Sequence, residues 1–208
     1  SLTKLTIPDS VKSIGQYSFS KCKVLEEVTI DSIKTEVQKD AFQDCFLFKH
    51  LIISSKEESL SDYSGSQYPS VIEITFTPGI RSIGDYVFYG CSTLTKIILP
   101  PTLLSIEEHA FEQCTELKEI IIPSSVKMIG KNSFECCVSL EKLQIPPNLM
   151  IIDDSVFIEC LSLEEIEIPS SVTSIGSYSF YNCSSLLEIS IPSSVNEISY
   201  SAFFSCSS

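Results

Sequence analysis

Apolar and polar positions recur along the chain with a fixed period of 23 residues. In the copy that begins at Leu117, aliphatic residues also stand at 120 and 122, and Pro123 follows. The last two aliphatic positions are two residues apart, which is the spacing of a strand with one buried face. Because proline cannot donate a hydrogen bond to a sheet ladder, it predicts the end of the strand and the start of a bend.

The second half of each copy predicts a second short strand and then a tight turn. Val126 and Ile129 form a further apolar pair, and Gly130 follows them. Phe134 precedes Cys137 by three residues, the spacing at which a single helical or 3-10 turn directs both side chains to the core. A positive φ at the glycine would permit the sharp bend before this turn. The glycines at this position are Gly15, Gly84, Gly130 and Gly176.

A fixed short period predicts a solenoid, in which each unit packs on its neighbours. We expect a single solenoid domain over residues 1–208, made of nine 23-residue repeats that start at residues 2, 25, 48, 71, 94, 117, 140, 163 and 186. Two columns recur along it and are expected to form core ladders. They are Phe19, Phe42, Phe88, Phe111, Phe134, Phe157, Phe180 and Phe203, and Cys22, Cys45, Cys91, Cys114, Cys137, Cys160, Cys183 and Cys206.

The repeat at residues 48–70 is degenerate. It keeps the strand positions, but Gly65 and Tyr68 stand where phenylalanine and cysteine are expected. It is either a drifted repeat with a looser outer side or an irregularity where the array bends or docks a partner. Neither end of the chain resembles the polar capping unit that closes a solenoid, so we expect a fragment of a longer array.

The full repeat, L-x-x-I-x-I-P-x-x-V-x-x-I-G-x-x-x-F-x-x-C-x-x, resembles the BspA-like class of leucine-rich repeat. The resemblance covers essentially the whole chain. It implies a curved leucine-rich-repeat solenoid with a parallel β-sheet on the concave face and short second strands and single helical or 3-10 turns on the other sides. It also implies a cell-surface or secreted protein that adheres to host or matrix proteins, with no catalytic residues to carry over.

Composition and charge exclude several classes of partner. Lys and Arg number 14 and Asp and Glu 27, so the net charge is 14 − 27 = −13. Such a chain repels phosphate, which argues against nucleic acid and against an anionic membrane surface. No apolar run approaches the ~20 residues of a membrane span, so we expect no membrane insertion by this segment.

The nine cysteines have two readings. Stacked coils lie ~4.8 Å apart, within the Cα range of a disulfide, but parallel side chains keep their Cβ atoms farther apart than disulfides usually do. We therefore expect buried free thiols rather than a disulfide ladder, with Cys136, which is off the column, exposed. Uniform spacing lacks the close ligand pairs of a zinc site, so no metal and no cofactor are predicted.

Enzymatic chemistry has little support in the sequence. The two histidines, His50 and His109, have no nucleophile motif beside them, and no glycine-rich phosphate loop is present. We expect no catalytic residues.

The strand positions that face solvent on the concave side suggest where a partner binds. One row alternates in charge and includes Lys96 and Glu119. In a parallel sheet, such a row is either a stabilising charge ladder or part of a recognition surface. The next row contains an apolar strip, which either reflects strand propensity or marks an interaction site. The candidate protein-binding residues are Ile52, Thr75, Ile98, Ile121, Lys96 and Glu119.

Together these patterns predict a non-enzymatic protein-binding module, part of a surface or secreted adhesin that contacts a host surface or extracellular-matrix protein. The alternative is an intracellular scaffold or regulatory solenoid, which unpaired thiols would suit. A structural spacer with no dedicated ligand is the third reading.

Overall fold

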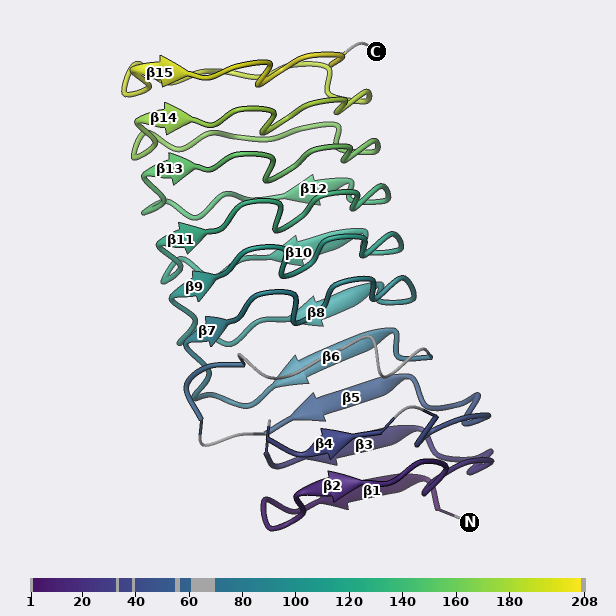
Figure 1. The fold of residues 1–208 in the computed structure, drawn as a ribbon. Coiled ribbons are helices and arrows are strands. Elements are labelled where there is room, and N and C mark those ends of the chain that lie inside the picture. Colours follow the sequence, from purple (N-terminus) through teal and green to yellow (C-terminus); the bar gives the residue numbers. More distant parts are fainter. Residues whose placement is uncertain (1, 33, 39, 55–56, 61–69, 207–208) are drawn as a thin grey trace.

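Strands form where the apolar alternation predicts them, and they stack coil upon coil from the N-terminus to the C-terminus (Figure 1). The computed structural model describes residues 2–32, 34–38, 40–54, 57–60 and 70–206. Gly65 and Tyr68 of the degenerate repeat lie outside these ranges. Within them, no helix is long and apolar enough to cross a lipid bilayer. The predicted solenoid of parallel strands is confirmed.

The first strands of the first seven repeats form one seven-stranded parallel sheet. Its strands, in spatial order, are β1 (Lys4–Ile7), β3 (Glu27–Ile30), β5 (His50–Ile53), β6 (Glu73–Phe76), β8 (Lys96–Ile98), β10 (Glu119–Ile121) and β12 (Lys142–Leu143). Each residue pairs with the residue 23 positions later, as in Lys4 with Glu27. Isolated bridges from Lys142 to Glu165 and from Glu165 to Glu188 carry the same register into the last two coils.

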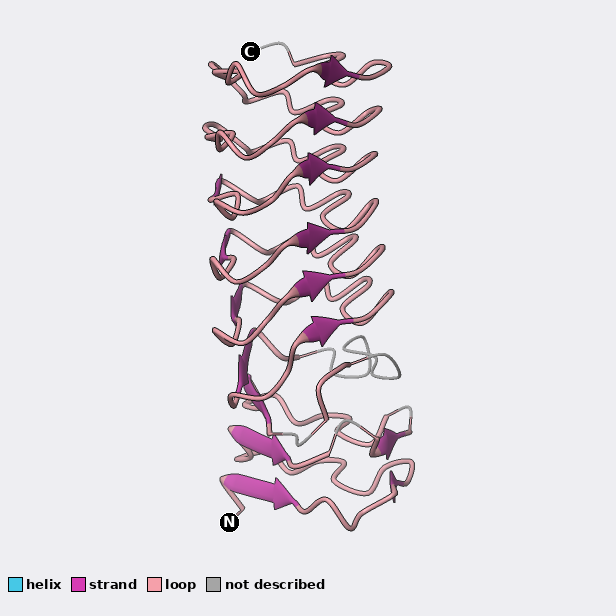
Figure 2. Ribbon diagram, turned by 90° about the vertical axis from the view of Figure 1, so that its left-hand side faces the viewer, coloured by secondary structure: helices cyan, strands magenta, loops and turns pink. Residues whose placement is uncertain are grey.

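The second strands lie on another side of the coils, one above the other (Figure 2). They are β2 (Ser13–Ile14), β4 (Glu36–Val37), β7 (Ser82–Ile83), β9 (Ser105–Ile106), β11 (Met128–Ile129), β13 (Ile151–Ile152), β14 (Ser174–Ile175) and β15 (Glu197–Ile198). They pair as β2-β4, as β11-β9-β7 and as β13-β14-β15. The degenerate repeat keeps this position, since Ser59 bridges to Ser82 and Leu60 is fully buried. Sequence reasoning missed the role of Leu60.

The third side of each coil is made of turns, and no helix or 3-10 segment occurs among the described residues. The helical turn between Phe and Cys is therefore not confirmed. What remains of it is one backbone hydrogen bond, such as that from the Cys137 N–H to the Phe134 carbonyl at 3.2 Å. The turns are also joined from coil to coil, for example by the Phe134 N–H and the Val156 carbonyl at 3.0 Å. All three sides of the stack are thus held by hydrogen bonds between coils.

The prediction that glycine supplies a positive φ before the turn is wrong. None of Gly15, Gly84, Gly130 and Gly176 has a positive φ. In the eight repeats whose turns the structure describes, the left-handed turn residues come two and six positions after the glycine position, and almost all of them are non-glycine. The first column is Tyr17, Asp40, Tyr86, His109, Asn132, Ser155, Tyr178 and Ser201, and the second is Lys21, Asp44, Gly90, Gln113, Cys136, Glu159, Asn182 and Ser205. Each non-glycine residue there costs about 1–2 kcal/mol, which the bonds between coils offset.

Close approach between coils explains two of the glycines. A Cβ on Gly130 would lie 2.7 Å from the backbone nitrogen of Glu108, and one on Gly176 would lie 2.6 Å from the carbonyl carbon of Asp153. Real Cβ atoms do not come that close to backbone. Glycine at these positions lets adjacent coils approach each other.

The phenylalanine column forms a stacked ladder in the core. Ring centroids of successive residues from Phe88 to Phe203 are 5.1–5.7 Å apart. At the start of the degenerate repeat and in the repeat after it, extra aromatic residues meet the ladder. Phe48 contacts Phe42 at 5.1 Å, and Phe76 lies edge-on to Phe88 at 6.1 Å. These two residues add aromatic packing that the other repeats do not need.

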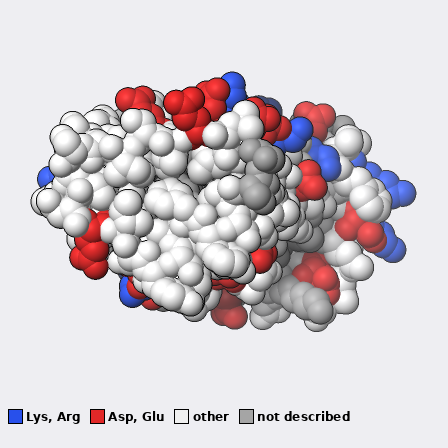
Figure 3. Space-filling model, turned by 90° about the horizontal axis from the view of Figure 1, so that it is seen from above, with Lys and Arg blue, Asp and Glu red and all other residues white. Residues whose placement is uncertain are grey.

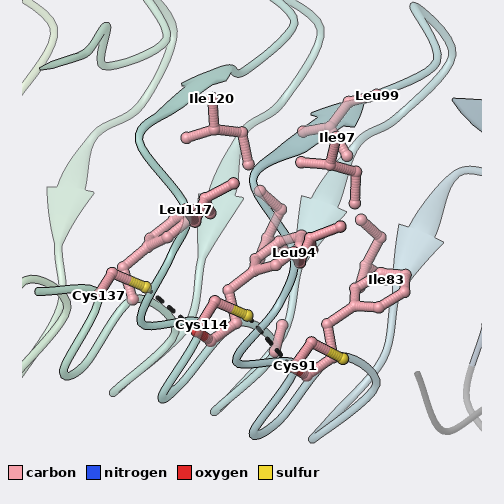
Figure 4. Packing of buried hydrophobic residues seen from close by; sticks show 14 of the residues in the cluster. Ile83, Cys91, Leu94, Ile97, Leu99, Cys114, Leu117, Ile120 and Cys137 are labelled. Carbon is pink, nitrogen blue, oxygen red and sulfur yellow. Dashed lines mark hydrogen bonds between the residues drawn. The ribbon is translucent and has the colours of Figure 1, made fainter. Parts of the chain in front are cut away.

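The cysteine column is a ladder of hydrogen bonds rather than of disulfides. All nine cysteines are free. Each thiol from Cys114 to Cys206 in the column donates to the carbonyl of the phenylalanine 26 residues earlier, as Cys137 does to Phe111 at 3.2 Å (Figure 4). Burial raises the pKa of Cys91 to about 12. The column therefore holds neutral thiols that act both as small apolar groups and as donors.

Cys136 was predicted to be exposed, but it is only half-buried, and Cys22 and Cys206 in the terminal coils are half-buried as well. Burial and then the nearby Glu159 carboxylate raise the pKa of the Cys136 thiol to about 11. Exposure alone therefore does not make Cys136 a reactive thiolate.

Candidate binding surface

The outward side of the seven-stranded sheet, with its continuation in the last two coils, is called here the long-sheet face. Along each strand, residues that belong to this face alternate with residues of the core, because successive side chains point to opposite sides of a sheet. In β8 and β10, Ile97 and Ile120 are buried, whereas Ile98 is 45% and Ile121 77% exposed. Two large aliphatic side chains are therefore held in solvent by the backbone alternation itself.

The four residues of the predicted apolar row are direct neighbours. Ile52 pairs with Thr75, Thr75 with Ile98, and Ile98 with Ile121. Exposure increases along the row, since Ile52 and Thr75 are half-buried and the last two are exposed. At the less exposed end of the row, the Thr75 hydroxyl is engaged by His50, whose Nε2 atom lies 2.9 Å away.

A hollow of about 300 Å³ lies around the exposed end of the row. Ile98 and Ile121 line it together with Lys96 and Glu119, as the sequence predicts for that end of the strip. Sequence reasoning missed the rest of its wall. Ile97 of β8 and three residues that follow the strands, Leu99, Pro101 and Pro123, complete the lining. Pro123 stands at the strand-ending position of its repeat and Pro101 comes directly after that position, so prolines contribute apolar surface beside the isoleucines.

Charges on the first half of the long-sheet face are mutually paired. The Lys4 ammonium lies 3.0 Å from the Glu27 carboxylate, and the His50 ring lies 3.3 Å from the same side chain. The hydrogen bond from Lys4 lowers the pKa of the Glu27 carboxyl, with the positive charge of Lys4 adding to the effect. Lys96 and Glu73 pair at 3.0 Å. The charge-ladder reading describes this half well.

The second half of the face is acidic. A broader hollow of about 720 Å³ is lined by five carboxylates and one ammonium, together with the exposed Ile121 and Leu187. The charged residues are Glu119, Lys142, Glu164, Glu165, Glu167 and Glu188. None of them forms an ion pair with another described residue. Seen from the C-terminal end, charged side chains gather at the upper edge, where this face lies, above a largely uncharged coil surface (Figure 3).

Sequence reasoning missed Leu187 and Glu164 as site residues. Their position in the repeat comes just before the strand, so it was not counted among the outward strand positions. Both lie at the second position of a repeat, next to the leucine that enters the core. Leu187 is 74% exposed, in the same hollow as Ile121. An aliphatic residue at a position that is mostly polar in other repeats was the available signal.

The two histidines contact carboxylates. His50 lies beside Glu27 and Thr75 on the long-sheet face, and His109 contacts Glu112 on the turn side. Neither histidine has a serine or cysteine among these partners. Among the residues that the structure describes, neither histidine therefore forms a serine–histidine or cysteine–histidine pair.

The sequence was compared with known families and structures. The family model described as a BspA type leucine rich repeat region, with six copies, matches residues 1–101 and 81–208. Together these two segments cover the whole chain. No curated protein was found to match.

Two solved structures share the fold. A leucine rich repeat protein of T. pallidum is 22% identical, with a TM-score of 0.50, over 67% of this chain and 78% of that one. A leucine-rich repeat protein from Eubacterium ventriosum is 17% identical, with a TM-score of 0.55, over 98% of this chain and 82% of that one. At these identities the similarity extends to the solenoid and not to particular surface residues.

Proposed function

Because the chain belongs to the BspA-type leucine-rich repeat family, we propose that it is a protein-binding module whose long-sheet face holds the partner. Leucine-rich repeats are generally protein-interaction modules and generally not enzymes. The proposed module is therefore non-enzymatic. The binding residues are Ile98 and Ile121 at the centre, Lys96 and Glu119 at the rim, and Ile52 and Thr75 at the less exposed end.

One observation carries this proposal: two adjacent isoleucines stand in solvent beside a hollow. Ile98 and Ile121 are neighbours in the sheet register, and both line the hollow of about 300 Å³. Exposed apolar patches with a polar rim are typical of protein interfaces, whose centres lose water on binding. Strand propensity alone would favour isoleucine there, but it does not account for the hollow that Pro101 and Pro123 complete.

The charges of the face support a partner with basic side chains. Five carboxylates and one ammonium line the broader hollow next to Ile121. Complementary charge steers association and excludes partners of like sign. We therefore expect a protein segment that presents basic side chains together with apolar ones.

The finer role we propose is that of a cell-surface or secreted adhesin that contacts a host surface or extracellular-matrix protein. Support comes from the family resemblance. An intracellular scaffold remains the second candidate, because a column of free, buried thiols is at home in a reducing compartment. Antibody labelling of intact and permeabilised cells separates the two, since a surface protein is labelled without permeabilisation.

The binding proposal is tested by selecting peptides from a random twelve-residue displayed library on the immobilised chain. We expect enriched peptides to carry Lys or Arg with aliphatic or aromatic residues. They should bind the unmodified chain and fail to bind the Ile98→Lys/Ile121→Glu double variant. Selected peptides that bind this variant at full strength would place the site elsewhere.

A matched control is available on the second-strand side. Met128 is 44% and Ile151 53% exposed, in two neighbouring coils. The Met128→Lys/Ile151→Glu variant makes the same kinds of change to exposed apolar residues away from the long-sheet face. It should keep full peptide binding. The adhesin role is tested separately with labelled chain on surfaces coated with single matrix proteins, where the same pair of variants should behave in the same way.

A further inference from the structure

A histidine and two glutamates from adjacent coils meet on the turn side of the solenoid, away from the long-sheet face. The potential ligand atoms of His109, Glu112 and Glu135 all lie within 4.8 Å of one another. All three side chains are only partly exposed. We propose that they form a binding site for one zinc ion, with solvent as the remaining ligand.

The backbone sets the positions of these three residues. The His109 N–H donates to the Lys131 carbonyl at 2.9 Å, and the Gln113 N–H donates to the Glu135 carbonyl at 2.8 Å. His109 has a left-handed φ of 57°, as does Asn132 at the same position of the next coil. Two turns of equal shape are thus held in register, so the ligands lie on a rigid part of the fold.

Neighbouring side chains orient the ligands. The ring of Tyr86 stacks on the His109 ring, with centroids 4.5 Å apart and planes 6° apart. The Asn132 amide donates to the Glu135 carboxylate, and the Gln113 amide lies 3.4 Å from the other oxygen of Glu112. Supporting contacts of this kind fix the orientation of metal ligands in known sites.

The charges within the cluster favour a cation. The His109 Nδ1 atom contacts the Glu112 carboxylate, and one imidazole balances at most one of the two carboxylates. Lys131, which lies in the same repeat as Glu135, directs its ammonium to Asp154 at 2.9 Å. A divalent ion would neutralise both glutamates at once, and it would replace the contact between His109 and Glu112 by bonds from both residues to the metal.

The ligand set selects among metals. Zinc accepts one imidazole nitrogen and two carboxylate oxygens at about 2.0–2.2 Å, usually with four ligands in all. Calcium and magnesium prefer oxygen alone, so a histidine in the set argues against them. The three ligand atoms, which lie within 4.8 Å of one another, would have to move to these distances from a bound ion.

The cluster is specific to two coils. At the positions of His109 and Glu112, other repeats carry tyrosine pairs such as Tyr86 with Tyr89 and Tyr178 with Tyr181, which pack edge-on at 5.8 Å. Repetition therefore does not require the polar set. Sequence reasoning missed it because it searched for closely spaced cysteines and histidines, whereas Glu135 comes from the next coil.

The test is calorimetric titration of the purified chain with zinc chloride near neutral pH, with thermal unfolding measured in zinc and in a chelator. We expect one zinc per chain and a higher unfolding temperature in zinc. His109→Ala and Glu135→Gln should each weaken binding by at least about tenfold, the effect of removing even a supporting residue of a metal site. Zinc should raise the unfolding temperature of neither variant above that variant's own value in the chelator.

Two controls keep the result decisive. His50→Ala removes the other histidine, and Cys136→Ser removes the nearby half-buried thiol, and neither should change zinc binding. Cobalt(II) bound at the site should show the visible absorption of a four-coordinate nitrogen and oxygen set, without a thiolate charge-transfer band. The proposal is overturned if zinc neither binds nor stabilises the chain, if binding survives the combined His109→Ala/Glu135→Gln change, or if a control abolishes it.

Discussion

The buried columns and the long-sheet face lie on the same coils and differ in how their residues vary along the stack. Buried positions keep one residue type, as in the ladder that runs from Phe88 to Phe203. Positions on the long-sheet face change from coil to coil, from Thr6 at the start through Ile121 to Glu167. Packing between identical coils requires the repetition, whereas the outward side chains are free of that requirement. The variable outward positions are therefore where we propose that a partner binds.

Within the face, the two halves also differ. In the first half, Lys4, Glu27 and His50 neutralise one another along the strands. In the second half, five carboxylates surround one ammonium beside exposed apolar residues. Surface ion pairs contribute little to stability, so the main effect of the ion pairs in the first half is to neutralise its side-chain charges. The charged side chains of the second half form no ion pair with another described residue, and this is the half to which we assign the basic partner segment.

The largest effect in this comparison is expected in the buried ladder. Phe134→Ala removes a fully buried ring that stacks on Phe111 and on Phe157, which leaves a cavity between coils. We expect the free energy of unfolding to fall by about 3–5 kcal/mol in urea titrations. Phe203→Ala is the control, since that ring is half-buried at the end of the ladder and should cost less. If the two variants lost the same free energy of unfolding, burial of the ring would not determine how much each phenylalanine stabilises the fold.

A smaller effect is expected where coils approach each other. Gly130→Ala would place a Cβ 2.7 Å from the nitrogen of Glu108, and backbone there has little room to move. We expect a loss of about 1–3 kcal/mol, as for other overpacked sites. In Gly15→Ala, the nearest atom is the Ser18 hydroxyl oxygen at 3.4 Å, so that variant should unfold close to the unmodified chain. If Gly15→Ala lost more stability than Gly130→Ala, close approach between coils would not be the reason for glycine at position 130.

The thiols provide a readout of the same packing without substitution. Burial raises the pKa of Cys91 and of Cys183 to about 12, so at neutral pH both are protonated and shielded. A thiol reagent should label Cys22, Cys136 and Cys206 first, and all nine only after unfolding. Disulfides between successive column cysteines in an oxidised sample would contradict the ladder of free thiols.

The same shift has a consequence for stability against pH. In the unfolded chain the thiols ionise near 9, whereas in the folded chain ionisation is delayed to about 12. The unfolded state therefore loses protons first as the pH rises above 9. The contribution of the buried thiols is complete below that pH and should decline progressively up to about 12. Unfolding free energies measured across this range check the sign.

The smallest effect on stability is expected on the long-sheet face. Ile98→Lys/Ile121→Glu changes two outward side chains, and surface changes away from special contacts usually shift stability by no more than ~0.5 kcal/mol each. Its unfolding curve should nearly overlay that of the unmodified chain. A loss comparable to that of Phe134→Ala would mean that these side chains belong to the core.

The sequence predicted the solenoid, its register and its buried columns because a period of 23 places equivalent positions of successive repeats side by side. Strand pairing at that interval, as between Glu119 and Lys142, follows directly. Features that depend on contacts between unlike positions were not predicted. The role of Gly130 depends on the backbone of the preceding coil, and that of Leu60 on its pairing with the following coil. The cluster of His109 and Glu135 depends on the turn shape, which period alone does not specify.

Site-specific photocrosslinking tests the central claim most directly, namely that the variable face binds and the repeated columns support it. A benzophenone amino acid replaces Ile121 in one variant and Met128 in another, and each is irradiated with a peptide selected on the unmodified chain. The account predicts crosslinked peptide from position 121 and none above background from position 128. Crosslinking at 128 without crosslinking at 121 would contradict it.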